Sequence, residues 1–270
     1  MSRARVLQNI DGTITDLARL EAIAVEAARS AARLVASRYG RATSIATKSS
    51  ATDVVTQTDL DSERLIRSVL ARRTPGAGVI GEEGGASGFA QRLQWVIDPL
   101  DGTVNFLYGV PIFSVSIAAA LDGEFVAGAV VDAMRGETFS AHLGGGAHID
   151  ATTTHASDCI DLSRALLTTG FSYTPRLRAM QGTIVERLLP AARDIRCFGS
   201  AALQLCWVAC GRTDGYFERD IKIWDWAGGA LIAAEGGATV ELPCPENDGL
   251  VVGTAPGVFD ALRGLVIAQS

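Results

Sequence analysis

The sequence predicts a layered fold in which an α+β first half is followed by an α/β second half. Short β-type runs separated by glycine-containing turns fill residues 78–141, which favours an antiparallel sheet. After residue 150, strand patterns and helix patterns alternate. With 270 residues and 48% hydrophobic content, the chain can bury a full core. We therefore expect one compact unit of two halves, residues 1–150 and 151–270, that meet at the functional site.

The first half begins with helical patterns and continues with strand patterns. Apolar residues at helical spacing predict a helix over 15–39, with Thr15 and Asp16 as capping candidates. The polar stretch 41–52 predicts a loop or a weak hairpin, and a second helix should run from about Thr58 to Arg73. Five short strands are then expected, at residues 78–80, 93–97, 112–120, 125–132 and 137–141.

The second half alternates strands with helices after a boundary near residues 150–158, where Thr, His and Ser cluster. Its strands are expected at residues 165–169, 194–197, 215–218, 238–242 and 250–253. Its helices are expected at residues 175–192, 201–210 and 224–235, with a closing helix from Pro256.

Charge and hydropathy exclude several function classes. A net charge of -6 gives no basic footprint, so nucleic acid is not expected as the primary partner. The longest apolar stretch, residues 110–121, is shorter than the roughly 20 residues of a membrane span. No secretory pattern is visible in the N-terminal residues, so we expect a cytoplasmic protein without a membrane partner. The five cysteines lack zinc-type spacing with histidine and are expected to be reduced, buried thiols.

The most informative segment is residues 95–106, where an apolar strand leads into two carboxylates. Pro99 and Gly102 shape the turn that we expect after the strand, and Gly102 allows close approach of a ligand to the backbone. Carboxylates this close repel one another unless a cation joins them. Asp98 and Asp101 therefore predict a site for a hard cation such as Mg²⁺.

Three further acidic clusters allow a structural reading as well as a functional one. The segment 81–84 is either a solvated turn or a pair of glutamates that reach a cation. Asp225 lies at a helix start, where N-capping alone would justify an acid. Asp59 and Asp61 lie in a first helical turn, where the helix dipole favours carboxylates.

Other chemistries fit the sequence less well. A calcium-binding EF-hand loop starting at Asp98 would place Leu100 and Gly102 at ligand positions and Gly109 where a glutamate is required. The chain has no Gly-x-Ser-x-Gly elbow and no nucleotide-binding P-loop sequence. The chemistry that remains consistent with the sequence is direct attack on the substrate by a metal-activated water molecule.

Three motifs in this order resemble the inositol monophosphatase family of Mg²⁺-dependent, lithium-sensitive phosphatases. They are Gly81-Glu82-Glu83, the segment 95–106, and Trp224-Asp225-Trp226-Ala227-Gly228. The resemblance extends from about Lys48 to the last helix. It implies a five-layer α-β-α-β-α sandwich of the sugar-phosphatase type, two to three Mg²⁺ ions per site, and a homodimer.

The resemblance also implies roles for individual residues. The metal ligands would be Glu82, Asp98, the carbonyl of Leu100, Asp101 and Asp225, with Glu82 also facing a third, weaker ion. Asp59 and Thr103 would take a proton from the attacking water. The phosphate would meet the N–H groups of Gly102 and Thr103, and Lys48 would lie on a mobile loop. The residues that meet the rest of the substrate would be Gly199, Ser200, Ala201 and Glu218.

The expected substrate is a small phosphomonoester, above all myo-inositol monophosphate or a related polyol or sugar monophosphate. Glu218 suits a neutral polyol, because it accepts hydroxyl protons and repels a second phosphate. Histidinol phosphate is the runner-up, and fructose bisphosphate and adenosine bisphosphates, which are substrates of relatives that share the metal motifs, are further alternatives. A regulatory binding protein that retains the fold is the non-enzymatic alternative. The bulky Trp226 departs from the usual motif, with an effect on substrate that the sequence leaves open.

Overall fold

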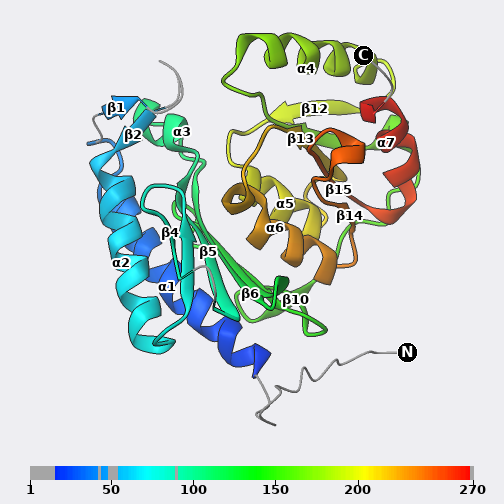
Figure 1. Cartoon of the computed structure of the whole chain (residues 1–270). Helices are drawn as coiled ribbons and strands as arrows, with labels where there is room; N and C mark the ends of the chain where they lie inside the picture. The colour runs from blue at the N-terminus through cyan, green and yellow to red at the C-terminus, as the bar shows by residue number, and fades with distance from the viewer. Residues whose placement is uncertain (1–15, 42–43, 48–53, 89–90, 268–270) are drawn as a thin grey trace.

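The computed structural model describes residues 16–41, 44–47, 54–88 and 91–267, and these residues form five layers of helices and sheets (Figure 1). Helices α1 and α2 cover one face of an eight-stranded sheet, and helices α5 and α6 cover its other face. A five-stranded sheet packs on the far side of α5 and α6, and helices α4 and α7 lie outside it. The arrangement confirms the predicted α-β-α-β-α sandwich.

The elements of the first half follow the predicted order from helices to strands. They are α1 (Leu17–Ser37), β1 (Ser44–Thr47), β2 (Val54–Thr56), α2 (Gln57–Arg73), β3 (Gly78–Gly81), β4 (Gly85–Ser87), β5 (Leu93–Asp101), α3 (Thr103–Tyr108), β6 (Ser114–Leu121), β7 (Glu124–Asp132), β8 (Thr138–His142), β9 (Gly146–Ile149) and β10 (Thr152–Thr154).

The second half alternates strands and helices as its sequence indicates. Its elements are η1 (Leu162–Arg164), β11 (Leu166–Thr169), α4 (Pro175–Leu188), β12 (Asp194–Cys197), α5 (Ala201–Ala209), β13 (Gly215–Arg219), α6 (Ile223–Glu235), β14 (Thr239–Glu241), η2 (Pro245–Asn247), β15 (Leu250–Thr254), η3 (Pro256–Val258) and α7 (Phe259–Ile267).

The two sheets differ in how their strands run. The first has the order β10-β9-β8-β7-β6-β5-β3-β4, and its only parallel pair among the described strands is β3 with β5. The second has the order β12-β11-β13-β15-β14 and mixes parallel with antiparallel pairs. The first sheet continues to β10, which lies beyond residue 150. The division of the chain into halves at residue 150 stays a prediction.

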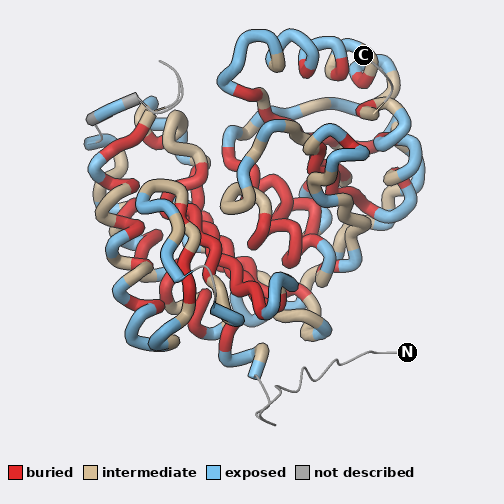
Figure 2. Tube along the Cα trace, in the orientation of Figure 1, coloured by how far each residue is buried: buried red, intermediate tan, exposed pale blue. Residues whose placement is uncertain are grey.

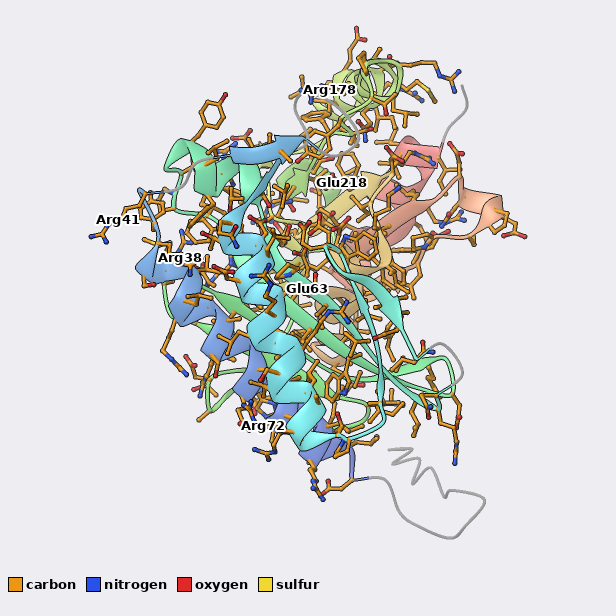
Figure 3. The ribbon with its side chains drawn as sticks, turned by 60° about the vertical axis from the view of Figure 1, so that its left-hand side comes forward. Arg38, Arg41, Glu63, Arg72, Arg178 and Glu218 are labelled. Carbon is orange, nitrogen blue, oxygen red and sulfur yellow. The ribbon has the colours of Figure 1, made fainter. Side chains whose placement is uncertain are left out.

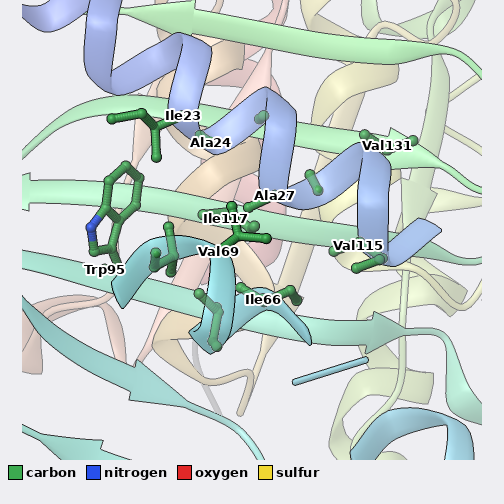
Figure 4. Packing of buried hydrophobic residues seen from close by; sticks show 14 of the residues in the cluster. Ile23, Ala24, Ala27, Ile66, Val69, Trp95, Val115, Ile117 and Val131 are labelled. Atoms are coloured by element: carbon green, nitrogen blue, oxygen red, sulfur yellow. The ribbon is translucent and has the colours of Figure 1, made fainter. Parts of the chain in front are cut away.

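The core of the first half lies between the helix pair and the sheet. Ile23 and Ala27 of α1 and Ile66 of α2 pack on Trp95 and Ile117 of the sheet (Figure 4). The alanine-rich face of α1 lets this helix lie close to β7. Figure 2 shows that the buried segments follow the first sheet and the central helices α5 and α6. Burial of this apolar surface is the main stabilising term of the fold.

Helix α6 joins the halves through a close approach to the first sheet. A Cβ at Gly228 would lie 2.8 Å from Ser116 Oγ of β6 and 3.3 Å from the Ile117 carbonyl oxygen, so a larger residue would require Ser116 or the helix to shift. Two residues earlier, Trp226 packs edge-to-face on Phe125, with 5.5 Å between ring centroids. The glycine and the tryptophan of this motif therefore hold α6 against the sheet.

Several element boundaries differ from the prediction for identifiable reasons. The helix expected over 175–192 ends at Leu188, because Pro190 cannot continue it. The strand expected to end at residue 97 continues to Asp101, and α3 follows it at once. Strands β4, β9 and β10 were not predicted. At three or four residues each, they are too short to show a clear alternating pattern.

The cysteines and the hydropathy of the helices were also predicted. All five cysteines are free thiols, but only Cys206 is buried, and Cys197 is exposed, so the expectation of five buried thiols is wrong. In the part of the chain that the structure describes, no helix has the length and apolar character needed to cross a membrane.

Candidate active site

A β-bulge in β5 places Asp98 and Asp101 on the same face of the sheet. Residues three apart in a regular strand point to opposite faces. Here Asp98 pairs with Ser116 and Asp101 pairs with Ser114, so three steps on β5 match two steps on β6. The extra residue restores the alternation, and both carboxylates face the side on which α6 packs. Pro99 is compatible with this strand because it lies within the bulge.

Asp101 is held by the start of helix α5 in the second half. Its carboxylate accepts hydrogen bonds from Ser200 Oγ at 2.6 Å, from the Ala202 N–H at 2.8 Å and from the Ala201 N–H at 3.2 Å. The positive end of a helix dipole also favours an anion at this position. Asp101 therefore fastens the acidic segment of the first half to the second half.

Burial and mutual repulsion act on the aspartates of this region. Asp98 is 1% exposed and Asp101 is 8% exposed. Burial raises the pKa of Asp98 well above its usual value, and the charge of Glu82 raises it further. The pKa of Asp101 is raised by burial to about 6, although the hydrogen bonds from α5 favour its charged form.

Asp225 at the start of α6 belongs to the same cluster. Burial raises its pKa well above the usual value, and the charges of Glu82 and Asp101 add to the effect. Its Oδ2 accepts the Lys222 N–H at 2.6 Å, so the capping role expected from the sequence is present. Gly81 pairs with Ile97, next to Asp98, and Gly228 of α6 approaches Ser116, the strand partner of Asp98, so the segments that carry the three motifs meet in space.

Asp59 and Thr103 form a second feature of the site, beside the acidic cluster. Asp59 is fully buried, and its Oδ1 accepts a hydrogen bond from Thr103 Oγ1 at 2.8 Å. The same hydroxyl lies 3.0 Å from the carbonyl oxygen of Leu100. Gly102, with φ of 99°, turns the chain from β5 into α3, so the first N–H groups of α3 lie next to Asp101.

Glu218 approaches the cluster from strand β13 of the second half. Its Oε2 accepts a hydrogen bond from Tyr216 Oη at 2.8 Å. Burial raises the pKa of Glu218 to about 8, and the charge of Asp101 contributes to the shift. A Cβ at Gly170 would lie 2.2 Å from the carboxylate oxygens, so glycine at this position is what leaves room for Glu218.

The donor chemistry of the cluster fits a hard cation. Within the described ranges, no three acidic, histidine or cysteine side chains converge closely enough to hold an ion as they stand. The carboxylates of Asp101 and Asp225 are instead turned toward protein N–H and O–H groups. A carboxylate has about four lone-pair positions, so the contact of Asp225 with the Lys222 N–H leaves it acceptors for a cation. Asp101 lies within hydrogen-bond distance of four donors, and a cation at its carboxylate would replace one of them. Buried carboxylates with raised pKa values are stabilised when a divalent cation joins them.

Most predicted site residues come together, but with contacts that the sequence did not indicate. Ser200 and Ala201 were predicted to meet the substrate. In the structure they donate hydrogen bonds to Asp101 and so position this acid. Asn105, which had been assigned no role, donates from Nδ2 to the Phe198 carbonyl at 2.6 Å and so fixes the backbone before Gly199. Lys48 lies outside the described residues.

Two residues that contact the site, Tyr216 and Glu63, were not singled out from the sequence. Tyr216 lies two residues before Glu218 on β13, and the alternation of side chains along a strand would have placed both on one face. Glu63 was given no role in the sequence analysis, yet it contacts the turn that carries Glu82. No signal in the sequence connects these two distant segments.

Comparisons with known proteins agree with this geometry. The model of the inositol monophosphatase family matches residues 16–270. Inositol-1-monophosphatase of Mycobacterium leprae is 47% identical over 228 residues, which are 80% of this chain and 78% of that protein. Nus factor SuhB of Pasteurella multocida is 44% identical over 230 residues, covering 84% of this chain and 85% of that protein. The structure of Mycobacterium tuberculosis SuhB superposes with a TM-score of 0.81 at 43% identity, covering 93% of this chain and 97% of that one.

Proposed function

Because the chain belongs to the inositol monophosphatase family, we propose that it hydrolyses myo-inositol monophosphate and related polyol or sugar monophosphates in a Mg²⁺-dependent reaction. The chain is an enzyme, an inositol-1-monophosphatase-like phosphoric monoester hydrolase. The observation that carries the finer proposal is the group of four carboxylates formed by buried Asp98 and Asp101 with half-buried Glu82 and Asp225. Burial raises the pKa values of the three aspartates, and the charge of Glu82 raises them further.

These carboxylates, with the Leu100 carbonyl, would hold two to three Mg²⁺ ions. Bound Mg²⁺ supplies charge neutralisation for the phosphate oxygens and lowers the pKa of a water molecule. Asp98 would be one of the residues that hold the ions, and it is the least exposed of the four carboxylates. The protein's contribution is to fix these oxygens before the substrate arrives.

The Thr103 and Asp59 pair would remove the proton of the attacking water. The Thr103 hydroxyl donates to Asp59, so a proton received by this oxygen passes on to a carboxylate 2.8 Å away. Asp59 is held for this role by the Thr56 N–H at 2.9 Å, which bonds to its other oxygen. A positioned base of this kind contributes about 10² to 10⁴ in rate.

The phosphate and the alcohol would be recognised by different halves of the molecule. The N–H groups of Gly102 and Thr103 at the start of α3 suit the phosphate. Gly199, Ala201 and Glu218 of the second half would meet the alcohol part. A polyol can exchange hydrogen bonds with the Glu218 carboxyl in either protonation state, since both states retain acceptor oxygens.

The direct test is phosphate release from a panel of substrates with Mg²⁺ and after treatment with EDTA. The panel contains myo-inositol monophosphate, histidinol phosphate, fructose bisphosphate and adenosine bisphosphate. We expect the polyol monophosphate to have the highest kcat/KM, and Asp98→Asn to abolish turnover. Equal activity of Asp98→Asn or of metal-free protein would refute the metal mechanism, whereas preference for histidinol phosphate would replace the substrate.

Three companion properties belong to the same proposal: lithium inhibition, a homodimer, and a cytoplasmic location. Activity unchanged at high LiCl would count against lithium sensitivity. Light scattering of the purified protein measures the oligomeric state, and a mass of one chain would count against the homodimer. Fractionation of the cells that make the protein tests its location.

A second candidate function is a regulatory binding role in transcription, which is supported by the relatives named Nus factor SuhB. In this role the fold would present a surface to a protein partner and would not require turnover. A pull-down with transcription proteins distinguishes the two. Capture unaffected by Asp98→Asn, together with no phosphatase activity on the panel, would favour this function over catalysis.

A further inference from the structure

Glu63 on helix α2 makes contacts that its place in the sequence does not suggest. It is a glutamate with 3% of its surface exposed, and it lies four residues after Asp59 on the same helix. Figure 3 shows it on the side of α2 that faces the β3–β4 hairpin. We propose that Glu63 is a positioning residue that sets the orientation of Glu82 and thereby the affinity of the site for Mg²⁺. This inference rests on the proposed function in taking Glu82 as a metal ligand.

The carboxylate of Glu63 binds the turn between β3 and β4 through both of its oxygens. Oε2 accepts the Glu83 N–H at 2.8 Å, and Oε1 accepts the Gly84 N–H at 2.8 Å. Arg67, one turn further along α2, donates from Nε to Oε1 at 2.7 Å and from Nη2 to the Gly85 carbonyl at 2.6 Å. The Glu63 carboxylate and the Arg67 guanidinium therefore bind the backbone of three consecutive residues, 83–85.

The turn is shaped to receive this carboxylate. A Cβ at Gly81 would lie 2.6 Å from Glu63 Oε1, and a Cβ at Gly84 would lie 2.4 Å from the same oxygen. Both distances are shorter than real Cβ contacts, so side chains at these two positions would push Glu63 away. The two glycines that flank Glu82 and Glu83 in the sequence are thus explained by Glu63.

The contacts of Glu63 restrict the backbone at Glu82 from its C-terminal side. On the other side, the Glu82 N–H donates to the Ile97 carbonyl at 3.3 Å, next to Asp98. The Glu82 backbone is therefore fixed between strand β5 and helix α2. Gly81 pairs with Ile97 on β5, so Glu82 lies beside Asp98, and a displacement of Glu82 changes the spacing of the acidic cluster.

Helix α2 would consequently serve two parts of the site. Residues four apart on a helix lie on one face, so Asp59 and Glu63 project from α2 in similar directions. Asp59 contacts Thr103 in the proton relay, and Glu63 contacts the turn of Glu82. One rigid element sets the spacing between the group that removes a proton and the group that binds a cation.

The test is the dissociation constant for Mg²⁺, measured by calorimetry on the full-length protein with Mg²⁺ alone as the probe. Glu63→Gln replaces one carboxylate oxygen with an NH₂ group. This group cannot accept a hydrogen bond, so either the Glu83 N–H or the Gly84 N–H loses its acceptor. We expect its dissociation constant to rise by about tenfold or more, the effect typical when the support of a metal ligand is removed. Because the ligands remain, kcat at saturating Mg²⁺ should recover to within about threefold of the wild type.

Two further variants separate positioning from general damage to the fold. Gly84→Ala leaves Glu63 intact but forces a methyl group against its oxygen, and it should weaken Mg²⁺ binding in the same way. Gly84 is exposed and does not have a positive φ angle, so we expect Gly84→Ala to fold. It therefore tests the inference even if Glu63→Gln does not fold. Asp61→Asn is the matched control on the same helix as Glu63, with unchanged binding expected. It removes a partly exposed acid that pairs with Arg38 at the end of α1.

The outcomes distinguish this inference from the function on which it rests. If Glu82→Gln weakens Mg²⁺ binding while Glu63→Gln and Gly84→Ala leave it within about twofold of the wild type, Glu63 is not a positioning residue. If Glu82→Gln itself has no effect on Mg²⁺ binding, the metal role of Glu82 fails first. Loss of kcat in Glu63→Gln that high Mg²⁺ does not restore would also overturn the inference, since it indicates structural damage.

Discussion

Replacing Glu218 with Gln should remove a large part of the pH dependence of stability. Burial raises the pKa of Glu218 from 4.5 to about 8 in the folded protein. Between these two values the unfolded chain releases the proton while the folded protein keeps it, so the free energy of unfolding falls as pH rises. Below the window both states are protonated, and above it both are ionised.

The magnitude follows from the width of this window. One pKa unit corresponds to about 1.4 kcal/mol, so the full effect is on the order of 5 kcal/mol and most of it is present by pH 8. Glutamine has nearly the same shape and stays neutral, and its amide oxygen can still accept the Tyr216 hydroxyl. The variant should therefore differ from the wild type by only about 1 kcal/mol near pH 5 and be more stable by several kcal/mol at pH 9.

Urea unfolding in EDTA, followed by tryptophan fluorescence at pH 5, 7 and 9, measures the difference. Groups that do not interact with Glu218 contribute equally in both proteins, so they cancel when the two curves are subtracted. Asp225, whose pKa the Glu218 charge raises, does not cancel fully, and the difference measures Glu218 together with this coupling. Glu186→Gln, an exposed glutamate of α4, is the control. A difference between wild type and Glu218→Gln that is the same at pH 5 and pH 9 would show that burial does not hold the proton on Glu218.

Three other predictions concern the relay, the approach of α6 and the start of α5. Thr103→Val should lower kcat about a hundredfold at saturating Mg²⁺ while Thr103→Ser retains most activity, because only the hydroxyl contacts Asp59; equal rates for the two would contradict the relay. Gly228→Ala should lower the free energy of unfolding by about 1–3 kcal/mol in urea, since its methyl group would lie 2.8 Å from a hydroxyl oxygen of β6; an unchanged midpoint would contradict that close approach. Ser200→Ala should cost about 1–2 kcal/mol of stability in the same assay and raise the pKa of Asp101 further, because it removes the 2.6 Å hydrogen bond; a cost near zero would argue against this contact.

The sequence predicted the helices and the long strands well, because these depend on local periodicity. It placed the end of β5 four residues too early, because Pro99 and two aspartates are unfavourable in an ordinary strand. The bulge makes them acceptable, and only the pairing with β6 reveals it. Glu63 was undervalued for a related reason: its partners at Glu83 and Gly84 lie about 20 residues away along the chain, and their contact depends on the tertiary fold.

Two of the acidic clusters show why a structural explanation and a catalytic one need not compete. Asp59 uses Oδ2 to accept the Thr56 N–H at the start of α2, and it uses Oδ1 to accept the Thr103 hydroxyl. Asp225 uses Oδ2 for the Lys222 N–H at the start of α6, while its charge acts within the acidic cluster. A helix start fixes one oxygen of each carboxylate and so orients the other. The capping preference that made both residues look ordinary in the sequence is therefore the means by which they are positioned for chemistry.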